Sequence, residues 1–253
     1  MNQSLELIKM MVSINIPMNT NNSAPHLQNL SLLKLIRLTS PSLPIGGYSY
    51  SQGLEFAISS GWVHDVSTAS DWIQGLLKNS LINLDLPVLK KLYEAWQEFD
   101  TERVCHWNDF LSANRDAFEL QEEDRQIGKA LARLLVDLDL EEAKPFLKPP
   151  YGGFLTLYSL AAVRWHISLN DAANGFLWMW SENKVLCAMK LIPLGQTDGQ
   201  KFYQALLKPF LMWLCRGWIC LMRILDTLLP GRELQVLCMK LSTQDYFVHK
   251  SKK

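Results

Sequence analysis

Apolar residues recur at intervals of three and four along most of this chain, which is the period of an amphipathic helix. From Leu32 to Leu38 they crowd one short stretch, and Pro41 cannot continue a helix. Residues 52–60 can form a second, shorter helix, which Gly61 is expected to close at its C′ position. No stretch alternates between apolar and polar side chains for long enough to require a strand. The pattern therefore predicts an all-α protein.

The same period continues through the middle of the chain. Ser67 is expected to cap one helix, and Pro87 suits the first turn of the next. Residues 101–139 keep the helical period over a length that fits either one long helix or two helices separated near residues 113–118. The sequence leaves both alternatives open.

The clearest interior break runs from Pro145 to Gly153, where prolines and glycines are dense. Helices are expected on its far side, over residues 154–165 and 171–189. The break is either a domain boundary or a loop, and the short connections common in helical bundles favour the loop. We therefore expect one bundle-like domain of roughly eight to ten helices, over residues 31–200.

The amino-terminal residues 1–30 are expected to be a flexible extension. Their apolar stretch, residues 5–18, is interrupted by polar residues and by Pro17, and it lacks the features of a secretory signal. Residues 19–25 have the composition of a linker.

The composition narrows the classes of function. The chain has 253 residues, and 48% are hydrophobic, which is enough to bury a sizeable core. It carries 25 basic and 25 acidic residues, a balance that argues against nucleic-acid binding, because phosphate contact needs a basic excess. Its 5 cysteines are odd in number and widely spaced, so they indicate a reducing compartment rather than a disulfide framework.

A turn rich in glycine and aromatic residues runs from Gly46 to Gly53, between the first two helices. Neither Ser49 nor Ser51 has glycines two residues before and two residues after it, as a nucleophile elbow requires. The turn also lacks the Lys-Ser/Thr pair of a phosphate-binding loop. It is either a tight connection or an exposed contact surface. Gly47 is expected to need a positive φ or to meet the backbone of a partner.

No set of residues has the spacing of a metal site or an active site. The histidines stand alone in the sequence, without a His-x-x-x-His pair. An acidic cluster at residues 119–124 has basic residues three or four positions away, which is typical of a solvated, internally compensated helix face. This pattern favours a binding or assembly protein that is not an enzyme.

Several ordered motifs extend over about two-thirds of the chain. They are Leu32–Glu55, Gly61-Trp62-Val63, Asp85-Leu86-Pro87, Arg115–Leu135, Trp180–Asn183 and Lys190–Gln196. Together these motifs closely resemble the signature of the urease accessory protein F (UreF) family.

The resemblance implies a cytoplasmic all-α protein that works as a homodimer. It implies binding to a second accessory protein, of the D or H type, and recruitment of the G-type GTPase through that complex. The assembly would sit on apo-urease and promote nickel insertion. The implied role is that of a scaffold that regulates the GTPase, with no cofactor of its own, because nickel and GTP are handled by the partners. Within the matching motifs, the candidate partner-binding residues are Gly46, Gly47, Tyr48, Ser51, Glu55, Lys190 and Gln196.

The carboxyl-terminal segment, residues 201–253, departs from the family pattern. Codons can be chosen for Gln235 to Phe247 that, when read two bases later, encode Ser-Ile-Val-His-Glu-Thr-Gln-Tyr-Ser-Gly-Leu-Phe. That peptide resembles the tail with which the family binds the D/H-type partner. The hypothesis is therefore that the reading frame shifts somewhere after Gln196.

The alternative function is that of a membrane-attached helical protein, anchored through residues 210–229. This segment has the length of a membrane span, but Arg216 and Arg223 would lie inside it at a cost of a few kcal/mol each. A shifted frame explains its composition without a membrane. A third class, a helical hydrolase using Ser49 or Ser51, lacks a recognisable base and acid.

Overall fold

The computed structural model describes residues 23–206, apart from Tyr48, Ser49, Asp116, Pro193, Leu194, Gln196 and Ala205. All the regular elements in this part of the chain are helical, which confirms the predicted all-α class. The elements are α2 (Ser23–Leu38), α3 (Leu54–Ser59), α4 (Val66–Leu76), η2 (Leu77–Asp85), α5 (Leu86–Gln97), α6 (Thr101–Ala113), α7 (Phe118–Asp137), η3 (Glu141–Leu147), α8 (Phe154–Arg164) and α9 (Leu169–Leu191), and residues 197–204 are helical as well.

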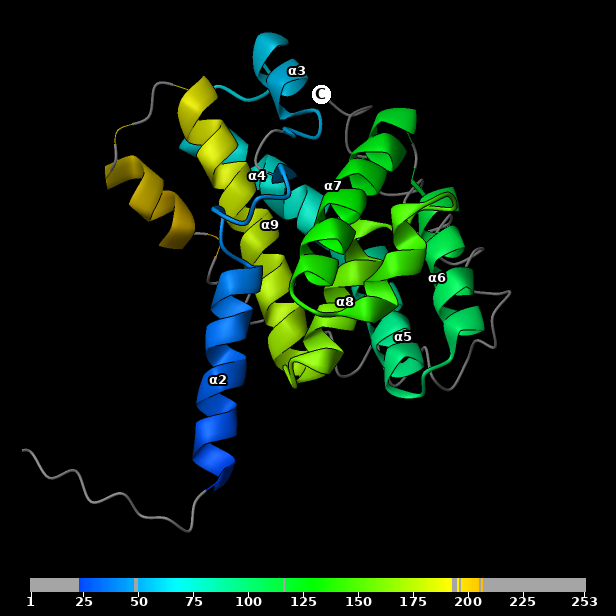
Figure 1. The fold of residues 1–253 in the computed structure, drawn as a ribbon. Helices are drawn as coiled ribbons and strands as arrows, with labels where there is room; N and C mark the ends of the chain where they lie inside the picture. Colours follow the sequence, from blue (N-terminus) through cyan, green and yellow to red (C-terminus); the bar gives the residue numbers. More distant parts are fainter. Residues whose placement is uncertain are drawn as a thin grey trace, which may run out of the picture.

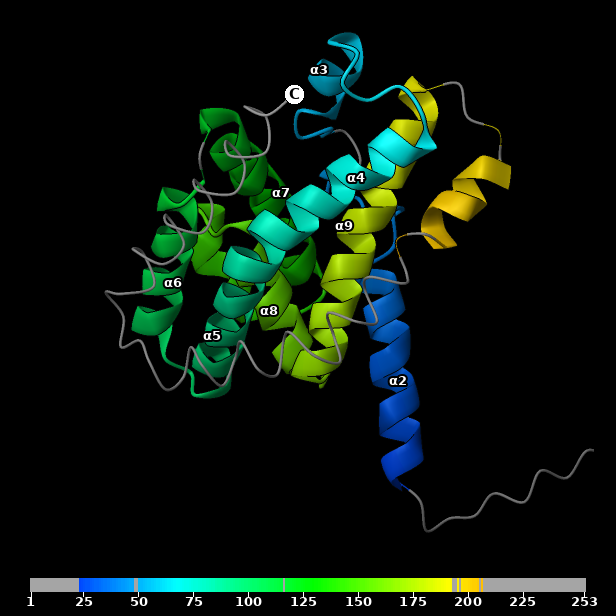
Figure 2. The same cartoon turned by 180° about the vertical axis from the view of Figure 1, so that it is seen from behind.

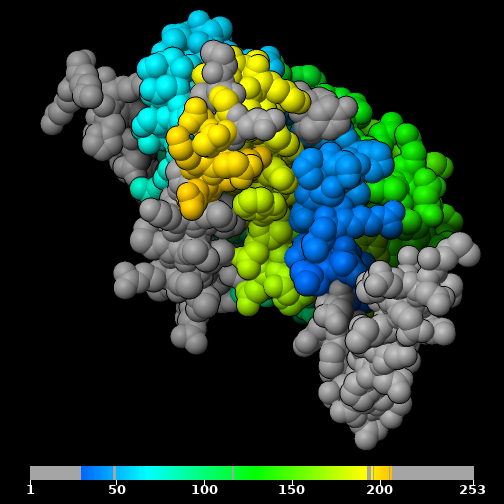
Figure 3. Space-filling view, turned by 90° about the vertical axis from the view of Figure 1, so that its left-hand side faces the viewer, coloured from blue at the N-terminus to red at the C-terminus, as the bar shows by residue number. Residues whose placement is uncertain are grey.

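Helix α8 lies at the centre of the bundle (Figure 1). Every residue from Phe154 to Ala162 is buried, as expected of a helix that is apolar on all sides. Helices α5 and α7 pack on it, and α9 contacts it as well. Helix α4 lies across α9 on the face seen in Figure 2, and α2 runs alongside α9 in Figure 3.

The two alternatives that the sequence left open are decided by the helix bounds and contacts. The span from residue 101 to 139 forms two helices, α6 and α7, which are separated where the sequence allowed a break. The break at residues 145–153 is a loop within the bundle, because η3 packs against α7 and α8 packs against both α5 and α7.

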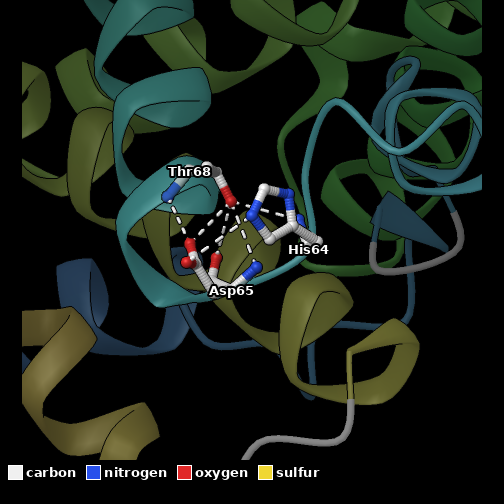
Figure 4. A network of polar contacts seen from close by, with 3 residues as sticks. All are labelled: His64, Asp65 and Thr68. Atoms are coloured by element: carbon white, nitrogen blue, oxygen red, sulfur yellow. Dashed lines mark hydrogen bonds and ion pairs between the residues drawn. The ribbon is translucent and has the colours of Figure 1, made fainter.

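The helix ends differ from the prediction in two places. Asp65, and not Ser67, caps α4: its Oδ1 accepts the Thr68 N–H at 2.8 Å, and Thr68 Oγ1 accepts the Asp65 N–H at 3.1 Å (Figure 4). A carboxylate at this position accepts hydrogen bonds from backbone N–H groups of the first turn, which have no acceptor within the helix. Helix α2 begins at Ser23, so residues 23–30 are helical and are not part of a flexible extension. Gly61, with φ of 73°, closes α3 as predicted.

Helices α4, η2 and α5 follow one another without a gap, so residues 66–97 form one continuous helical rod. Its middle part, η2, is a π-helix, which the sequence did not predict. Pro87 lies in the first turn of α5, as expected. No helix in the part of the chain described here is long and apolar enough to cross a membrane. Residues 210–229, the alternative anchor, lie outside that part.

Candidate partner-binding site

The turn between α2 and α3 is fixed to the bundle by apolar side chains and by glycine conformations. Leu43 and Ile45 are buried beneath it. Gly46 and Gly53 have φ of 77° and 82°, and Gln52 has φ of 51°, so the chain reverses direction through the left-handed region. These conformations fix the described residues on both sides of Tyr48 and Ser49.

The structure brings most of the predicted site residues to one end of the bundle. Gly46, Gly47 and Ser51 are partly exposed in the turn, and Glu55 is exposed in the first turn of α3. Lys190 is exposed in the last turn of α9. Helix α3 packs against α9 and lies beside its carboxyl end in Figures 1 and 2. Tyr48 and Gln196 lie outside the described residues.

A polar network that the sequence did not reveal holds the turn from below. Gln52 donates to Glu123 Oε1 at 2.7 Å and accepts the indole N–H of Trp180 at 2.9 Å. Lys184 Nζ donates to the carbonyl oxygen of Tyr50 at 2.9 Å. The network thus ties residues of the turn to α7 and to α9.

The two charged members of this network are buried, and their pKa values reflect it. Lys184 is 3% exposed, and burial lowers its pKa to about 8, although attraction to Glu123 opposes the shift. Burial raises the pKa of the Glu123 carboxyl, against the effects of Lys184 and of the hydrogen bond from Gln52. Each charge is costly to bury without the other, so the network favours one arrangement of the turn.

A buried ion pair between Arg115 and Asp85 lies next to this network. The Arg115 guanidinium donates to both oxygens of Asp85, at 2.6 and 3.3 Å, and the Asp85 side chain is 3% exposed. Burial alone would lower the pKa of Arg115, but Asp85 and Asp124 outweigh it and raise the pKa. Asp124 also accepts the N–H of Phe154 at 3.1 Å, which places a carboxylate at the start of α8. The Arg115–Asp85 pair links the loop before α7 to η2, and the bond from Phe154 to Asp124 links α8 to α7.

The predicted solvated acidic face is wrong for two of its members. Glu122 does form a surface pair with Arg125, at 2.8 Å from Oε2 to Nε. Glu123, however, is only 9% exposed, and Asp124 is turned toward α8. Glu123 is in phase with the buried Ile127 and with the residues that follow at intervals of four, so it points into the bundle. The spacing of Glu123 from the apolar residues of α7 could have indicated its burial, but its charge favoured a place on the surface.

A cavity of about 180 Å³ lies between the turn, α7, α9 and η2. Its lining is mostly apolar, with the charged groups described above and with Asn183, whose Oδ1 is buried without a hydrogen-bond partner. In the described ranges, no three His, Cys, Asp or Glu side chains converge as a metal site. The polar groups around the cavity therefore support the turn that lies above it.

The two adjacent glycines of the turn allow strain and contact to be separated by mutation. The positive φ expected at Gly47 belongs instead to Gly46, and a Cβ on Gly47 would make only ordinary contacts, at 3.9 and 4.0 Å. Gly46→Ala is therefore expected to destabilise the turn by about 1–2 kcal/mol, because Ala is strained at this φ. Gly47→Ala should leave stability unchanged in thermal unfolding. Equal losses of stability would contradict this assignment, whereas weaker partner binding by Gly47→Ala alone would indicate direct contact there.

Comparison with known proteins agrees with the resemblance. The family model for UreF matches residues 63–207. The urease accessory protein UreF of Alkalilimnicola ehrlichii is 49% identical over 180 residues, which cover 71% of this chain and 79% of that protein. The UreF proteins of Teredinibacter turnerae and Hahella chejuensis are each 47% identical, over 71% and 70% of this chain and 81% and 80% of their own length. The chain therefore belongs to the UreF family of urease accessory proteins, and it is not itself an enzyme.

Proposed function

We propose that this protein is a scaffold that assists nickel insertion into urease and regulates the G-type GTPase. In this proposal it works in the cytoplasm as a homodimer, in a complex with the D/H-type accessory protein, the GTPase and apo-urease. Nickel and GTP are held by the partners. The observation that supports this role most directly is that the described residues of the turn are partly exposed, while Gln52 and the carbonyl oxygen of Tyr50 are anchored to α7 and α9 by hydrogen bonds.

A contact surface gains affinity when it is ordered before binding, because less conformational entropy is then lost in the complex. The left-handed residues of the turn and the buried network beneath it provide that order. The exposed ends of α3 and α9 extend the surface beyond the turn. This arrangement suits a protein that positions other proteins.

Glu55→Ala and Lys190→Ala are each expected to keep the helical fold and to reduce urease activation several-fold. Both side chains are exposed, so their loss costs little stability, whereas a charged contact with a partner would be lost. The measurement is the nickel content and activity of urease matured with each variant, alongside helicity by circular dichroism. Glu102→Ala on α6 and Lys148→Ala are the matched controls, because both residues are exposed away from the turn. Normal nickel content with either site variant would remove that residue from the site.

The hypothesis of a shifted frame after Gln196 makes a separate prediction about the D/H-type partner. The chain with its present carboxyl end is expected to bind that partner at least about tenfold more weakly than a frame-restored version. Polar groups that the family tail would pair stay unpaired, at roughly 1–3 kcal/mol each when buried. Co-expression of the partner with each version, followed by purification of the soluble complex, measures the difference. Equal yields of complex would contradict a damaged carboxyl end. The boundary between the UreF-like domain, residues 31–200, and the atypical carboxyl-terminal segment, residues 201–253, stays a prediction.

A further inference from the structure

Lys184 of α9 is a buried amine whose hydrogen bond joins two distant parts of the chain. The residue is 3% exposed, and its Nζ donates to the carbonyl oxygen of Tyr50 in the turn at 2.9 Å. The same Nζ lies 5.5 Å from the centroid of the Trp180 ring. An ammonium group keeps its proton most easily in water, and burial favours the neutral amine. The bond to Tyr50 is therefore made by a group whose charge is opposed by its surroundings.

The turn contributes no charge of its own, so the charged neighbours of Lys184 come from the bundle. Residues 39–54 contain no acidic and no basic side chain. Glu123 of α7 attracts the charge of Lys184, and the thiol of Cys187, one turn further along α9, acts in the same direction. The other charged groups that line the cavity are Asp85 of η2, Arg115 before α7 and Asp124 of α7. Burial outweighs the attraction, so the pKa of Lys184 is lowered to about 8.

The cavity of about 180 Å³ separates Lys184 from solvent only while the turn stays in place. Lys184 and Glu123 line it on the side of the bundle, and Gly47 and Gln52 line it on the side of the turn. We call the arrangement with Nζ bound to Tyr50 closed, and one in which the turn has moved away from α9 open. Water reaches Lys184 in the open arrangement, and its pKa then returns toward about 10.4, the value of a hydrated lysine.

The sign of the pH effect follows from these two pKa values. Between them, the open arrangement keeps the proton of Lys184 and the closed arrangement releases it. Protonation therefore favours opening, and the closed arrangement becomes more stable as the pH rises through this window. The ratio of open to closed falls about tenfold between about pH 7 and about pH 9. The neutral amine still donates an N–H to Tyr50, so the bond remains while the cost of burying a charge disappears.

We propose that Lys184 makes the turn at residues 46–53 a pH-sensitive contact surface, which is held closed at alkaline pH and opens more often as the pH falls toward neutral. The inference rests on the proposed function in one respect, which is that the closed turn is the form that binds the partners. Less conformational entropy is lost when an ordered surface binds, so the affinity of the turn for a partner rises with pH.

Hydrogen exchange of the full chain measures the opening without any partner. Two amides report on the turn: Leu54 N–H donates to the Ser51 carbonyl at 3.3 Å, and Ala57 N–H donates to the Gly53 carbonyl at 3.0 Å. Their protection is taken relative to the intrinsic exchange rate at each pH. It is expected to rise about tenfold between about pH 7 and about pH 9.

Two variants and one control assign the effect to Lys184. Lys184→Met fills a similar volume and cannot be protonated, so the rise in protection should vanish. Glu123→Gln removes the attraction that opposes the lowered pKa of Lys184, so the rise should become larger. This second variant keeps the test decisive if Lys184→Met disturbs the packing of α9. Lys148→Met is the matched control, because Lys148 is exposed after η3, and it should keep the rise of the parent chain.

The results that would overturn the inference can be told apart. Protection that stays constant with pH in the parent chain would remove the pH-sensitive turn. An equal rise in Lys184→Met would assign the effect to another group, such as the Cys187 thiol. A smaller rise in Glu123→Gln would contradict the electrostatic account of Lys184.

The link to the proposed function has its own measurement. The affinities of the parent chain, its frame-restored version and Lys184→Met for the purified GTPase and the purified D/H-type protein are compared at about pH 7 and about pH 9. For one of the two proteins, the affinity should rise with pH in the parent and should not rise in Lys184→Met. A rise in protection without a rise in affinity would overturn the role of the turn as the contact surface. Failure of both parent versions to bind either protein would contradict the proposed function and leave the exchange result standing.

Discussion

Arg115→Met is expected to lower the free energy of unfolding by about 3 kcal/mol at neutral pH, because it leaves buried carboxylates without their cation. The Arg115 side chain is 17% exposed and bonds both oxygens of Asp85, and its charge also acts on Asp124. Methionine fills a similar volume but provides no donor. Urea unfolding, monitored by circular dichroism, measures the change.

The pH dependence of this loss has a definite sign. Burial raises the pKa of Asp124, and Arg115 opposes that rise, so the variant has a still higher pKa at this carboxyl. An acid whose pKa is raised in the folded state destabilises the fold above its unfolded pKa, and protonation relieves that cost. The difference between parent and variant should therefore shrink as the pH falls through the folded pKa of Asp124.

Arg125→Met is the matched control for this experiment. Arg125 is also paired with a carboxylate three residues away, but the side chains of Arg125 and Glu122 are 39% and 36% exposed. Surface pairs of this kind contribute between zero and about 1 kcal/mol. Similar losses in the two variants would contradict a special role for the buried pair.

Gly128→Ala is expected to be the more disruptive of the two changes, with a loss of about 3 kcal/mol or more and failure to fold at elevated temperature. A Cβ at this position of α7 would lie 2.7 Å from the Gly153 carbonyl carbon and 3.0 Å from that of Gly152. These are backbone atoms, so no side-chain rotation can relieve the contact. Separation of α7 from the start of α8 would also break the bond between Asp124 and the Phe154 N–H.

Gly75→Ala provides the control, because Gly75 lies within α4 and a Cβ there meets no atom within 4 Å. Alanine is the better helix former, so this variant should gain up to about 1 kcal/mol. Thermal unfolding of the two variants side by side measures both effects. A gain or no change in Gly128→Ala would show that α7 and the loop before α8 can separate at little cost.

The helices could be predicted from sequence because each depends on neighbours three and four residues away. The break between α6 and α7 and the closure of α3 by Gly61 are local features of this kind. The cap of α4 was misplaced by two residues because Ser67 and Asp65 are both good capping residues, and the choice depends on which one meets Thr68.

The buried polar network beneath the turn could not be predicted from the sequence in the same way. Polarity alone places Glu123 and Lys184 on the surface, yet both are buried. Their burial depends on Gln52 and Tyr50, which are distant in sequence and meet them only after the bundle has formed. The candidate residues of the turn could be chosen from family motifs, whereas the groups that hold the turn could be identified only in the folded structure.

The π-helical part of the rod between α4 and α5 determines where the chain can change its length. A π-helix places more residues in each turn than an α-helix does. Loss of one residue within Leu77–Asp85 can be absorbed as a π-turn tightens to an α-turn, and the flanking helices then keep their orientation. The same loss within α5 would rotate all later positions by about 100°, which would turn Leu92 and Trp96 away from α8. Insertions and deletions among relatives are therefore expected to concentrate in η2.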